Sequence, residues 1–356
     1  MAVALMNENK AVAFEEKMVA ILNHGALANM ISIGHRAELF DTMQELPPST
    51  SAEIAEAAGK DERYVREWLG ALVVGGVIEY HPATKTYFLP REHAACLTRD
   101  AAPNNLAALA QYIPQLGAVE DEIVECFERG GGVPYSSFRR FHEIMADDSG
   151  QSVLPALMDH ILPLIPGVKE RLQAGIDVVD IGCGVGKALN LLAQHFPNSR
   201  FTGYEFSDEA IDKATAEARA IGNRNIEFLF QDAAEIADVE AFDLVFTFDA
   251  IHDQADPARV LRNIHRALRP GGWYLMQDIK AHTHLHENLD HPIGPLLYTV
   301  SCMHCMTVSL AQGGLGLGTM WGRELAEQML AEAGFTELAV HELAHDIQNL
   351  YFVMQK

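Results

Sequence analysis

Hydrophobic and polar positions in the second half of the chain follow two alternating periods. Short runs rich in β-branched and aromatic residues are separated by stretches with helical spacing, such as 187–195. Five runs behave as strands, beginning at Val178 (VVDIG), Arg200 (RFTGY), Ile226 (IEFLF), Phe242 (FDLVFTF) and Trp273 (WYLMQD). Strands that alternate with helices predict an open, mostly parallel α/β sheet over this region.

The first half predicts helices instead. Apolar residues at helical spacing over 11–30 predict a packing or dimerisation helix. A capped helix follows at STSAEIAEAAG, where Thr50 or Ser51 can cap and Glu53 lies in the first turn, and Gly59 ends it. A second helix over 61–74 and two short strands around Pro82 complete the order expected of a winged helix.

These patterns predict three parts. We expect the amino-terminal helices and the winged helix within 1–100, and a mainly helical connector, interrupted at 130–135, within 101–174. The α/β domain is expected over 175–356, with an insertion at about 281–322.

The strand at 178–181 runs directly into a glycine-rich turn of the form DxGxGxG, from Asp180 to Gly186. Glycines allow a tight turn whose backbone can approach a ligand, and the acid supplies an acceptor beside it. Two more acids follow strands. Glu205 stands at the distance of a ribose-binding acid in a βαβ unit, and Asp232 can accept from an adenine amino group. An adenosyl ligand is the hypothesis that these residues favour.

Two other nucleotide sites fit less well. A dinucleotide-binding turn has the spacing GxGxxG, whereas this turn is GxGxG preceded by an acid. A phosphate-binding loop needs a hydroxyl after its lysine, but Lys187 is followed by Ala188. We therefore do not expect a nucleotide triphosphatase.

With these landmarks, residues 175–280 resemble the core of a class I S-adenosylmethionine-dependent methyltransferase. The resemblance implies a Rossmann-like domain with a seven-stranded, mostly parallel sheet, and S-adenosyl-L-methionine as the cofactor. It places the glycine loop at the methionine part, Glu205 at the ribose and Asp232 at the adenine. The expected cofactor-binding residues are Asp180, Gly182, Cys183, Gly184, Gly186, Glu205, Phe206, Asp232, Ala233, Phe248 and Tyr135.

The segment AIHDQADP follows the fourth strand of this core and supplies a candidate general base, His252, with Asp253 to orient it. Methyltransferases that carry an amino-terminal winged helix and methylate oxygen have a similar segment, HDWSD, whose histidine deprotonates the acceptor hydroxyl. His252 and Asp253 match that pattern, and Gln254 replaces its tryptophan. The resemblance also implies a homodimer formed through the amino-terminal domain.

The acceptor site is expected in the least charged part of the chain. No charged residue lies between Asp290 and Arg323, while prolines and glycines there make a membrane-spanning helix implausible. A buried lid over an apolar or aromatic acceptor is the favoured interpretation, with a subunit interface as the alternative. We expect the pocket to include His142, Tyr298, Met303, His304 and Trp321.

Two further groups leave alternatives open. His282, His284 and His286 alternate, with His291 nearby, and could converge on a metal or simply be solvated. Cys302 and Cys305 form a single CxxC pair, which favours buried reduced thiols over a zinc or thiol-handling site. No metal is predicted, although a metal- or thiol-dependent methyltransferase stays an alternative.

Charge and cysteine content limit the expected partners and the expected cellular compartment. The net charge is −23, and the second helix of the winged-helix region, residues 61–75, carries a net charge of −1, so nucleic acid is not an expected partner. A ligand-sensing winged-helix regulator remains the hypothesis from another class. Five cysteines in no disulfide pattern and a start without a signal peptide favour a cytoplasmic protein. The leading prediction is a methyltransferase for a small, largely apolar or aromatic acceptor, acting at oxygen with His252 as the base.

Overall fold

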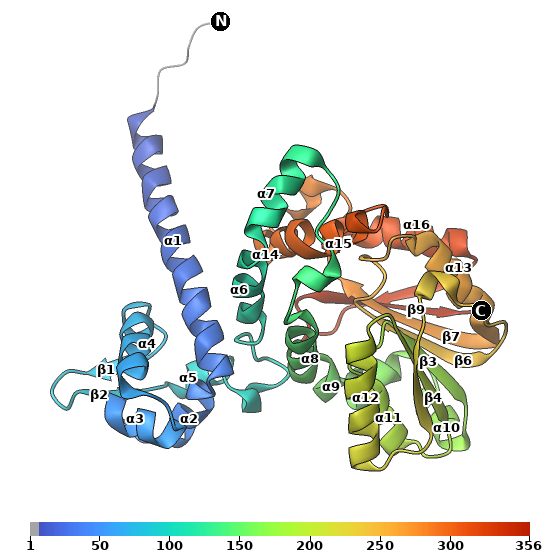
Figure 1. Ribbon diagram of the computed structural model, residues 1–356, viewed down its shortest axis with the longest axis horizontal. Helices are drawn as coiled ribbons and strands as arrows, with labels where there is room; N and C mark the ends of the chain where they lie inside the picture. Colours follow the sequence, from blue (N-terminus) through green and yellow to red (C-terminus); the bar gives the residue numbers. More distant parts are fainter. Residues whose placement is uncertain (1–6) are drawn as a thin grey trace, which may run out of the picture. The chain divides into compact units, whose positions relative to one another are not determined.

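The computed structural model describes residues 7–356, which form two compact units that divide between Pro114 and Gln115 (Figure 1). The first unit contains a long helix, three shorter helices, a hairpin and a further helical turn. Their bounds are α1 Glu8–Arg36, α2 Leu39–Glu45, α3 Ser51–Ala58, α4 Glu62–Val74, β1 Glu79–His81, β2 Thr86–Phe88 and α5 Arg91–Ala94.

The winged-helix order predicted from sequence is present in this unit. Thr50 caps α3 with Glu53 in a reciprocal capping box, and Gly59 ends the helix with a φ of 62°. The hairpin pairs Tyr80 with Tyr87. Apolar side chains of α2, α3 and α4 form one core, which includes Phe40 and Trp68 with ring centroids 5.3 Å apart.

Helix α1 is the exception to this packing. Every residue from Asn7 to Ala26 is exposed, including the large apolar side chains of Phe14, Met18 and Leu22. The predicted helix over 11–30 is therefore confirmed and is longer than expected, and its residues up to Ala26 pack against no core of the described chain.

The second unit begins with the helical connector. Its helices are α6 Tyr112–Gly117, which spans the division between the units, α7 Glu120–Arg129, α8 Phe141–Gln151, α9 Val153–Ala156 and α10 Val168–Ala174, with a π-helical turn at Leu157–Ile161. Helix α7 ends at Gly130, where the sequence predicted an interruption.

A seven-stranded sheet forms the centre of the second unit, in the order β5-β4-β3-β6-β7-β9-β8. Only β9 runs antiparallel to its neighbours, so the prediction of a mostly parallel sheet is confirmed. The strands are β3 Asp177–Ile181, β4 Arg200–Glu205, β5 Ile226–Phe230, β6 Phe242–Phe248, β7 Leu268–Ile279, β8 Glu337–His341 and β9 Asn349–Gln355.

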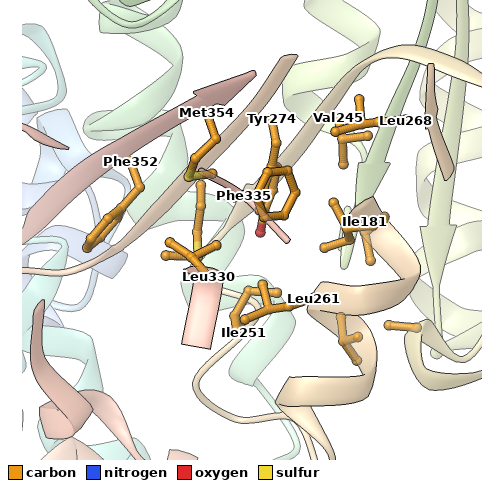
Figure 2. Close-up of a cluster of buried hydrophobic side chains, with 14 of the residues drawn as sticks. Ile181, Val245, Ile251, Leu261, Leu268, Tyr274, Leu330, Phe335, Phe352 and Met354 are labelled. Carbon is orange, nitrogen blue, oxygen red and sulfur yellow. The ribbon is translucent and has the colours of Figure 1, made fainter. Parts of the chain in front are cut away.

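Helices cover both faces of this sheet, because successive strand residues point to opposite sides. Val178 packs in one core with α11, and the next residue, Val179, packs in another with α13 and α16. Figure 2 shows part of the second core, where Tyr274 of β7 lies among Leu330, Phe335 and Met354. The helices of the domain are α11 Lys187–His195, α12 Asp208–Ile221, α13 Pro257–Ala267 and α16 Gly322–Ala333.

The uncharged segment is an insertion between β7 and α16. It contains α14 Gly294–Val300, a π-helical turn at Ser301–Cys305 (η8), α15 Met306–Ala311 and the short turn η9 Thr319–Trp321. Among the described residues, no helix has both the length and the apolar character needed to cross a membrane.

Candidate active site

The candidate residues gather where the parallel strands of the sheet end. Asp180 lies in β3 just before the glycine loop, Glu205 ends β4, Asp232 follows β5, and His252 follows β6. The carboxyl ends of parallel strands share one edge of a sheet, which is where open α/β folds bind ligands. The structure thus brings residues far apart in sequence to one edge.

The glycine loop is shaped by close contacts on one side and open space on the other. A side chain at Gly186 would place its Cβ 2.4 Å from the ring of Phe228 and 2.8 Å from Ala214 Cβ. A Cβ at Gly184 would meet nothing within 4 Å, although its φ of 53° is left-handed. The loop therefore packs its end against the sheet and α12 and leaves Gly184 facing free space.

Glu205 is tied directly to this loop. The backbone N–H of Gly184 donates to its Oε2 at 2.9 Å, and the N–H groups of Phe206 and Ser207 donate to its Oε1 at 2.8 and 3.0 Å. Three donors fix the carboxylate at the mouth of the loop. The sequence predicted that the acid and the loop belong to one site, and the structure joins them by a hydrogen bond.

Asp180 is a buried acid with one carboxylate oxygen that has no hydrogen-bond partner within the described chain. Its carboxylate is 3% exposed, and the oxygen without a partner is Oδ1. Burial, together with the nearby Glu205 carboxylate, raises the pKa of Asp180 to about 8. Cys183 is half-buried and its Sγ lies 3.8 Å from the Gly184 carbonyl oxygen, to which it donates. The unpartnered oxygen of Asp180, close to the Glu205 carboxylate, suits a cationic group.

The expected adenine region is open. Asp232 uses Oδ1 to accept from the N–H of Ala234 at 2.8 Å, and the intervening Ala233 is buried. Phe206 is 62% exposed, and its ring centroid lies 5.2 Å from that of Phe230. Two exposed aromatic rings beside the ends of β4 and β5 offer an apolar surface on which a flat base can stack. Phe248, at the end of β6, instead stacks on Phe246 at 5.7 Å.

His252 forms the most constrained pair of the site. Its Nδ1 lies 2.7 Å from Oδ1 of Asp278, and both side chains are almost fully buried. The indole of Trp321 and the N–H of Ile279 also donate to that oxygen, at 3.0 and 2.8 Å. Burial by itself lowers the pKa of His252, but Asp278 and the neighbouring Cys305 outweigh it, and the pKa rises well above 6.5.

Asp253 lies beside this pair without replacing it. Burial raises its pKa to about 6, and the neighbouring His252 opposes that rise. Burial, Asp253 and Glu205 together raise the pKa of Tyr135 well above 10. Tyr135, from the connector, is therefore close enough to Glu205 and Asp253 to be influenced by both carboxylates.

The sequence interpretation missed Asp278 and Asp249. Asp249 directly follows β6 with a left-handed φ of 51°, and its pKa is raised well above 3.8 by burial and by Asp278. Asp249, His252 and Asp278 place ligand atoms within 4.8 Å of one another, a spacing that a metal could also use. The acids after the strands FDLVFTF and WYLMQ were the available sequence clue.

His304 lies inside an aromatic cluster contributed by the connector. Its ring stacks on Phe141 with centroids 3.5 Å apart, and Phe138 and Tyr135 approach at 4.5 and 5.5 Å. It is fully buried, and burial lowers its pKa well below 6.5. Its Nδ1 lies 3.5 Å from Cys305 Sγ. His142 joins the cluster through Tyr135 at 5.0 Å.

The other expected pocket residues are placed differently. Trp321 is 3% exposed and supports Asp278 from within the core, Tyr298 is 37% exposed on α14, and Met303 is half-buried in η8. Their contact with an acceptor stays a prediction.

The histidine-rich loop does not converge as a set. His282 pairs with Glu324 at 2.7 Å, while His284 and His286 stack on each other with centroids 5.8 Å apart. Glu287 joins His282 and Glu324 in an exposed group with ligand atoms within 4.8 Å. His291 donates from Nε2 to the carbonyl oxygen of Lys280, 2.7 Å away. The cysteines of the CxxC pair are free, with Cys305 buried and Cys302 half-buried.

Both arginines of α4 are engaged with acids of the same helix. Arg63 pairs with Glu67 at 2.5 Å and Arg66 with Glu62 at 2.9 Å. A helix that reads DNA needs basic side chains free for phosphate. The regulator hypothesis gains no support from this surface.

Comparisons with known proteins agree with the architecture. Residues 25–99 match a family described as Rv2258c-like winged HTH domain, and residues 172–334 match a family described as methyltransferase domain. The chain therefore combines a winged helix-turn-helix domain with a methyltransferase domain.

One curated relative is 27-O-demethylrifamycin SV methyltransferase of Amycolatopsis mediterranei, 30% identical over 125 residues. The match covers 34% of this chain and 43% of the relative, less than half of its length.

Solved structures match the whole architecture. Human N-acetylserotonin methyltransferase with S-adenosylmethionine has a TM-score of 0.68 and 16% identity, covering 100% of this chain and 99% of its own. A candidate O-methyltransferase from Nostoc punctiforme has a TM-score of 0.70 and 20% identity, covering 96% of this chain and 98% of its own. At these identities the likeness establishes the fold.

Proposed function

We propose that this protein is an S-adenosylmethionine-dependent methyltransferase that methylates a small, largely apolar or aromatic acceptor at oxygen. The observation that carries the proposal is the buried His252–Asp278 pair at the same sheet edge as the glycine loop and Glu205. An oriented base beside an adenosyl-type loop suits methyl transfer to a hydroxyl.

The residues present fit the cofactor. Asp180 has a buried oxygen without a partner and so suits the cofactor's ammonium group, while the space above Gly184 suits close approach of its methionine part. Glu205 would bind the ribose, Asp232 and Ala233 the adenine edge, and Phe206 its face. When bound, S-adenosylmethionine supplies an electrophilic methyl group on a positively charged sulfur.

Residues of the chain would remove the proton of the acceptor hydroxyl. With Nδ1 directed to Asp278, His252 would use Nε2 to take the proton of an acceptor hydroxyl, in place of its present interaction with the buried Cys305 thiol. The imidazolium that forms is stabilised by Asp278, whose position Trp321 and Ile279 hold.

The acceptor class rests on the surroundings of the base. Tyr135, Phe138, Phe141 and His304 provide an aromatic, uncharged wall, since burial keeps His304 neutral. Such a wall suits a flat apolar acceptor. The names of two relatives also point to small aromatic or apolar acceptors: one is 27-O-demethylrifamycin SV methyltransferase and the other is N-acetylserotonin methyltransferase.

We also propose a homodimer formed through the amino-terminal unit, because the apolar side chains of α1 lie exposed along about five turns. A cytoplasmic location is proposed from the five free cysteines, which suit a reducing compartment.

Calorimetric titration with S-adenosylhomocysteine tests the cofactor. We expect binding by the wild type and at least a tenfold weaker affinity in Glu205→Ala, because a bonded carboxylate at the loop is lost. Glu337→Ala, an exposed acid on β8 at the other end of the strand order, is the matched control and should bind normally. Absence of binding by the wild type, or undiminished binding by Glu205→Ala, would overturn the proposal.

A further inference from the structure

A pocket lies in the methyltransferase unit between helix α7 and the η8–α15 segment. Its volume is about 420 Å³. Helix α7 contributes one wall with Ile123, Cys126 and Phe127, and the η8–α15 segment contributes the facing wall with Cys302, Met306 and Leu310. Glycines of two loops, 130–131 and 313–314, complete the lining.

The chemistry of this pocket is uniform. None of its lining residues carries a charge, and Thr307, the one side chain with a hydroxyl, uses its Oγ1 to accept from the N–H of Val133 at 2.7 Å. Three sulfur atoms, from Cys126, Cys302 and Met306, make the walls soft and polarisable. A pocket of this size and lining suits an uncharged apolar small molecule.

The pocket is separate from the reaction centre. Cys302, Met306 and Leu310 are spaced by four residues and line the pocket, whereas Cys305 and Ser309 lie on a neighbouring, buried face of the same segment. The hydroxyl of Ser309 donates to the Gln254 carbonyl at 2.8 Å, two residues after His252. The helical segment thus stands between the pocket and the loop that carries the base.

We propose that this pocket is a second ligand site, which takes an uncharged, apolar small molecule distinct from the methyl acceptor. It rests on the lining and volume alone and does not depend on the proposed methyltransferase activity. The two walls come from α7 and the insertion, so a ligand there would bridge the connector and the segment that holds the Gln254 loop.

Binding of N-phenyl-1-naphthylamine, an uncharged apolar dye whose fluorescence rises in apolar surroundings, tests the site. We expect saturable binding by the full chain and at least a fivefold loss of affinity in Cys302→Phe, which fills the space between the walls. Leu310→Phe provides a second filling variant in case one fails to fold, as judged by its thermal transition. Leu289→Phe, at a residue 75% exposed outside the pocket, is the matched control and should bind as the wild type does.

Thiol protection locates the dye independently. With iodoacetamide and peptide mass spectrometry, the dye should slow alkylation of Cys126 and Cys302 at least threefold and leave Cys96, a half-buried thiol of the other unit, unchanged. Three results would overturn the second site. They are no saturable dye binding by the wild type, dye binding by both filled variants as tight as that of the wild type, or protection of Cys96 equal to that of Cys126 and Cys302. Neither experiment uses S-adenosylmethionine or an acceptor, so their outcome is independent of the proposed reaction.

Discussion

Nδ1 of His252 and Oδ1 of Asp278 lie 2.7 Å apart, although the two residues are 26 positions apart and come from different strand ends. The loop after β6 supplies the imidazole and the end of β7 supplies the carboxylate. Their burial makes the interaction strong, because little water competes for either group.

Asp278→Asn should separate the role of this carboxylate from folding. Without the charge, the pKa of His252 should fall, and turnover on any acceptor that the wild type methylates should drop about 10²- to 10⁴-fold. The affinity for S-adenosylhomocysteine should change less than threefold. Nuclear magnetic resonance titration of the imidazole and calorimetry measure the two effects. An unchanged histidine pKa would contradict the pairing.

The pH dependence of methyl transfer should follow His252. Asp278 and Cys305 raise its pKa well above 6.5 against the effect of burial, so the imidazole keeps its proton, and cannot act as a base, up to a higher pH than an ordinary histidine. Turnover should rise with pH through a midpoint above 6.5, and that midpoint should move to lower pH in Asp278→Asn. The rate profile of kcat measures this. A midpoint that stays in place in the variant would exclude His252 as the titrating group.

The residues of the site that belong to local motifs could be predicted from the sequence, whereas contacts between residues far apart in the sequence could not. The glycine turn, Glu205 and His252 are recognisable because each stands at a fixed place after a strand. Asp278 follows a strand and could have been noticed, but its pairing with His252, and the hydrogen bond that Trp321 donates to it, are contacts that only the packed sheet creates. The same holds for His304, which stacks on Phe141 from a segment 163 residues earlier.

The fold was more predictable than the site for the same reason. Alternating apolar runs in β3 to β7 and the capping box at Thr50 are local properties, and both are present in the structure. The last two strands, β8 and β9, and the π-helical turn at Ser301–Cys305 depend on neighbouring elements, and no sequence pattern located them.

Asp180→Asn should stabilise the ligand-free protein while weakening the cofactor site. The folded pKa of about 8 lies above an unfolded value of about 3.9, so the folded state holds the proton longer and stability falls as pH rises between these values. The amide removes this dependence and should raise the unfolding free energy at pH 8 by ~1–3 kcal/mol. Urea unfolding at pH 5 and pH 8 measures it. A variant that loses stability equally at both pH values would contradict the assignment.

S-adenosylhomocysteine should bind this variant at least tenfold more weakly, because the ammonium group of the ligand loses its charged partner. Asp212→Asn, an exposed acid on α12, is the control and should change neither property.

Dimerisation should depend on the apolar side chains of α1. Phe14 and Leu22 are 61% and 69% exposed, so charging both, as Phe14→Glu with Leu22→Glu, should leave the fold intact and disrupt an interface formed there. Sedimentation equilibrium should shift from dimer to monomer. Glu15→Lys on the same helix should remain dimeric. A doubly charged variant that still sediments as a dimer would place the interface elsewhere.

Gly186→Ala and Gly184→Ala should divide stability from ligand binding within one loop. The Cβ at position 186 would lie 2.4 Å from the Phe228 ring in a backbone with a φ of 68°, so overpacking and strain should lower the unfolding free energy by about 2–4 kcal/mol. A Cβ at position 184 would meet nothing within 4 Å, so only the strain of the left-handed φ should lower the unfolding free energy of Gly184→Ala, by about 1–2 kcal/mol.

For ligand binding, unlike for stability, Gly184→Ala should be the more damaging of the two substitutions. The added methyl at position 184 would project into the space that S-adenosylhomocysteine is proposed to fill, and should weaken its binding at least tenfold in a protein that remains folded. Urea unfolding and calorimetry on the same samples separate the two quantities. If Gly184→Ala binds the ligand as tightly as the wild type does, the cofactor does not approach the loop at this residue, and Glu205 and Asp180 cannot hold it in the proposed way.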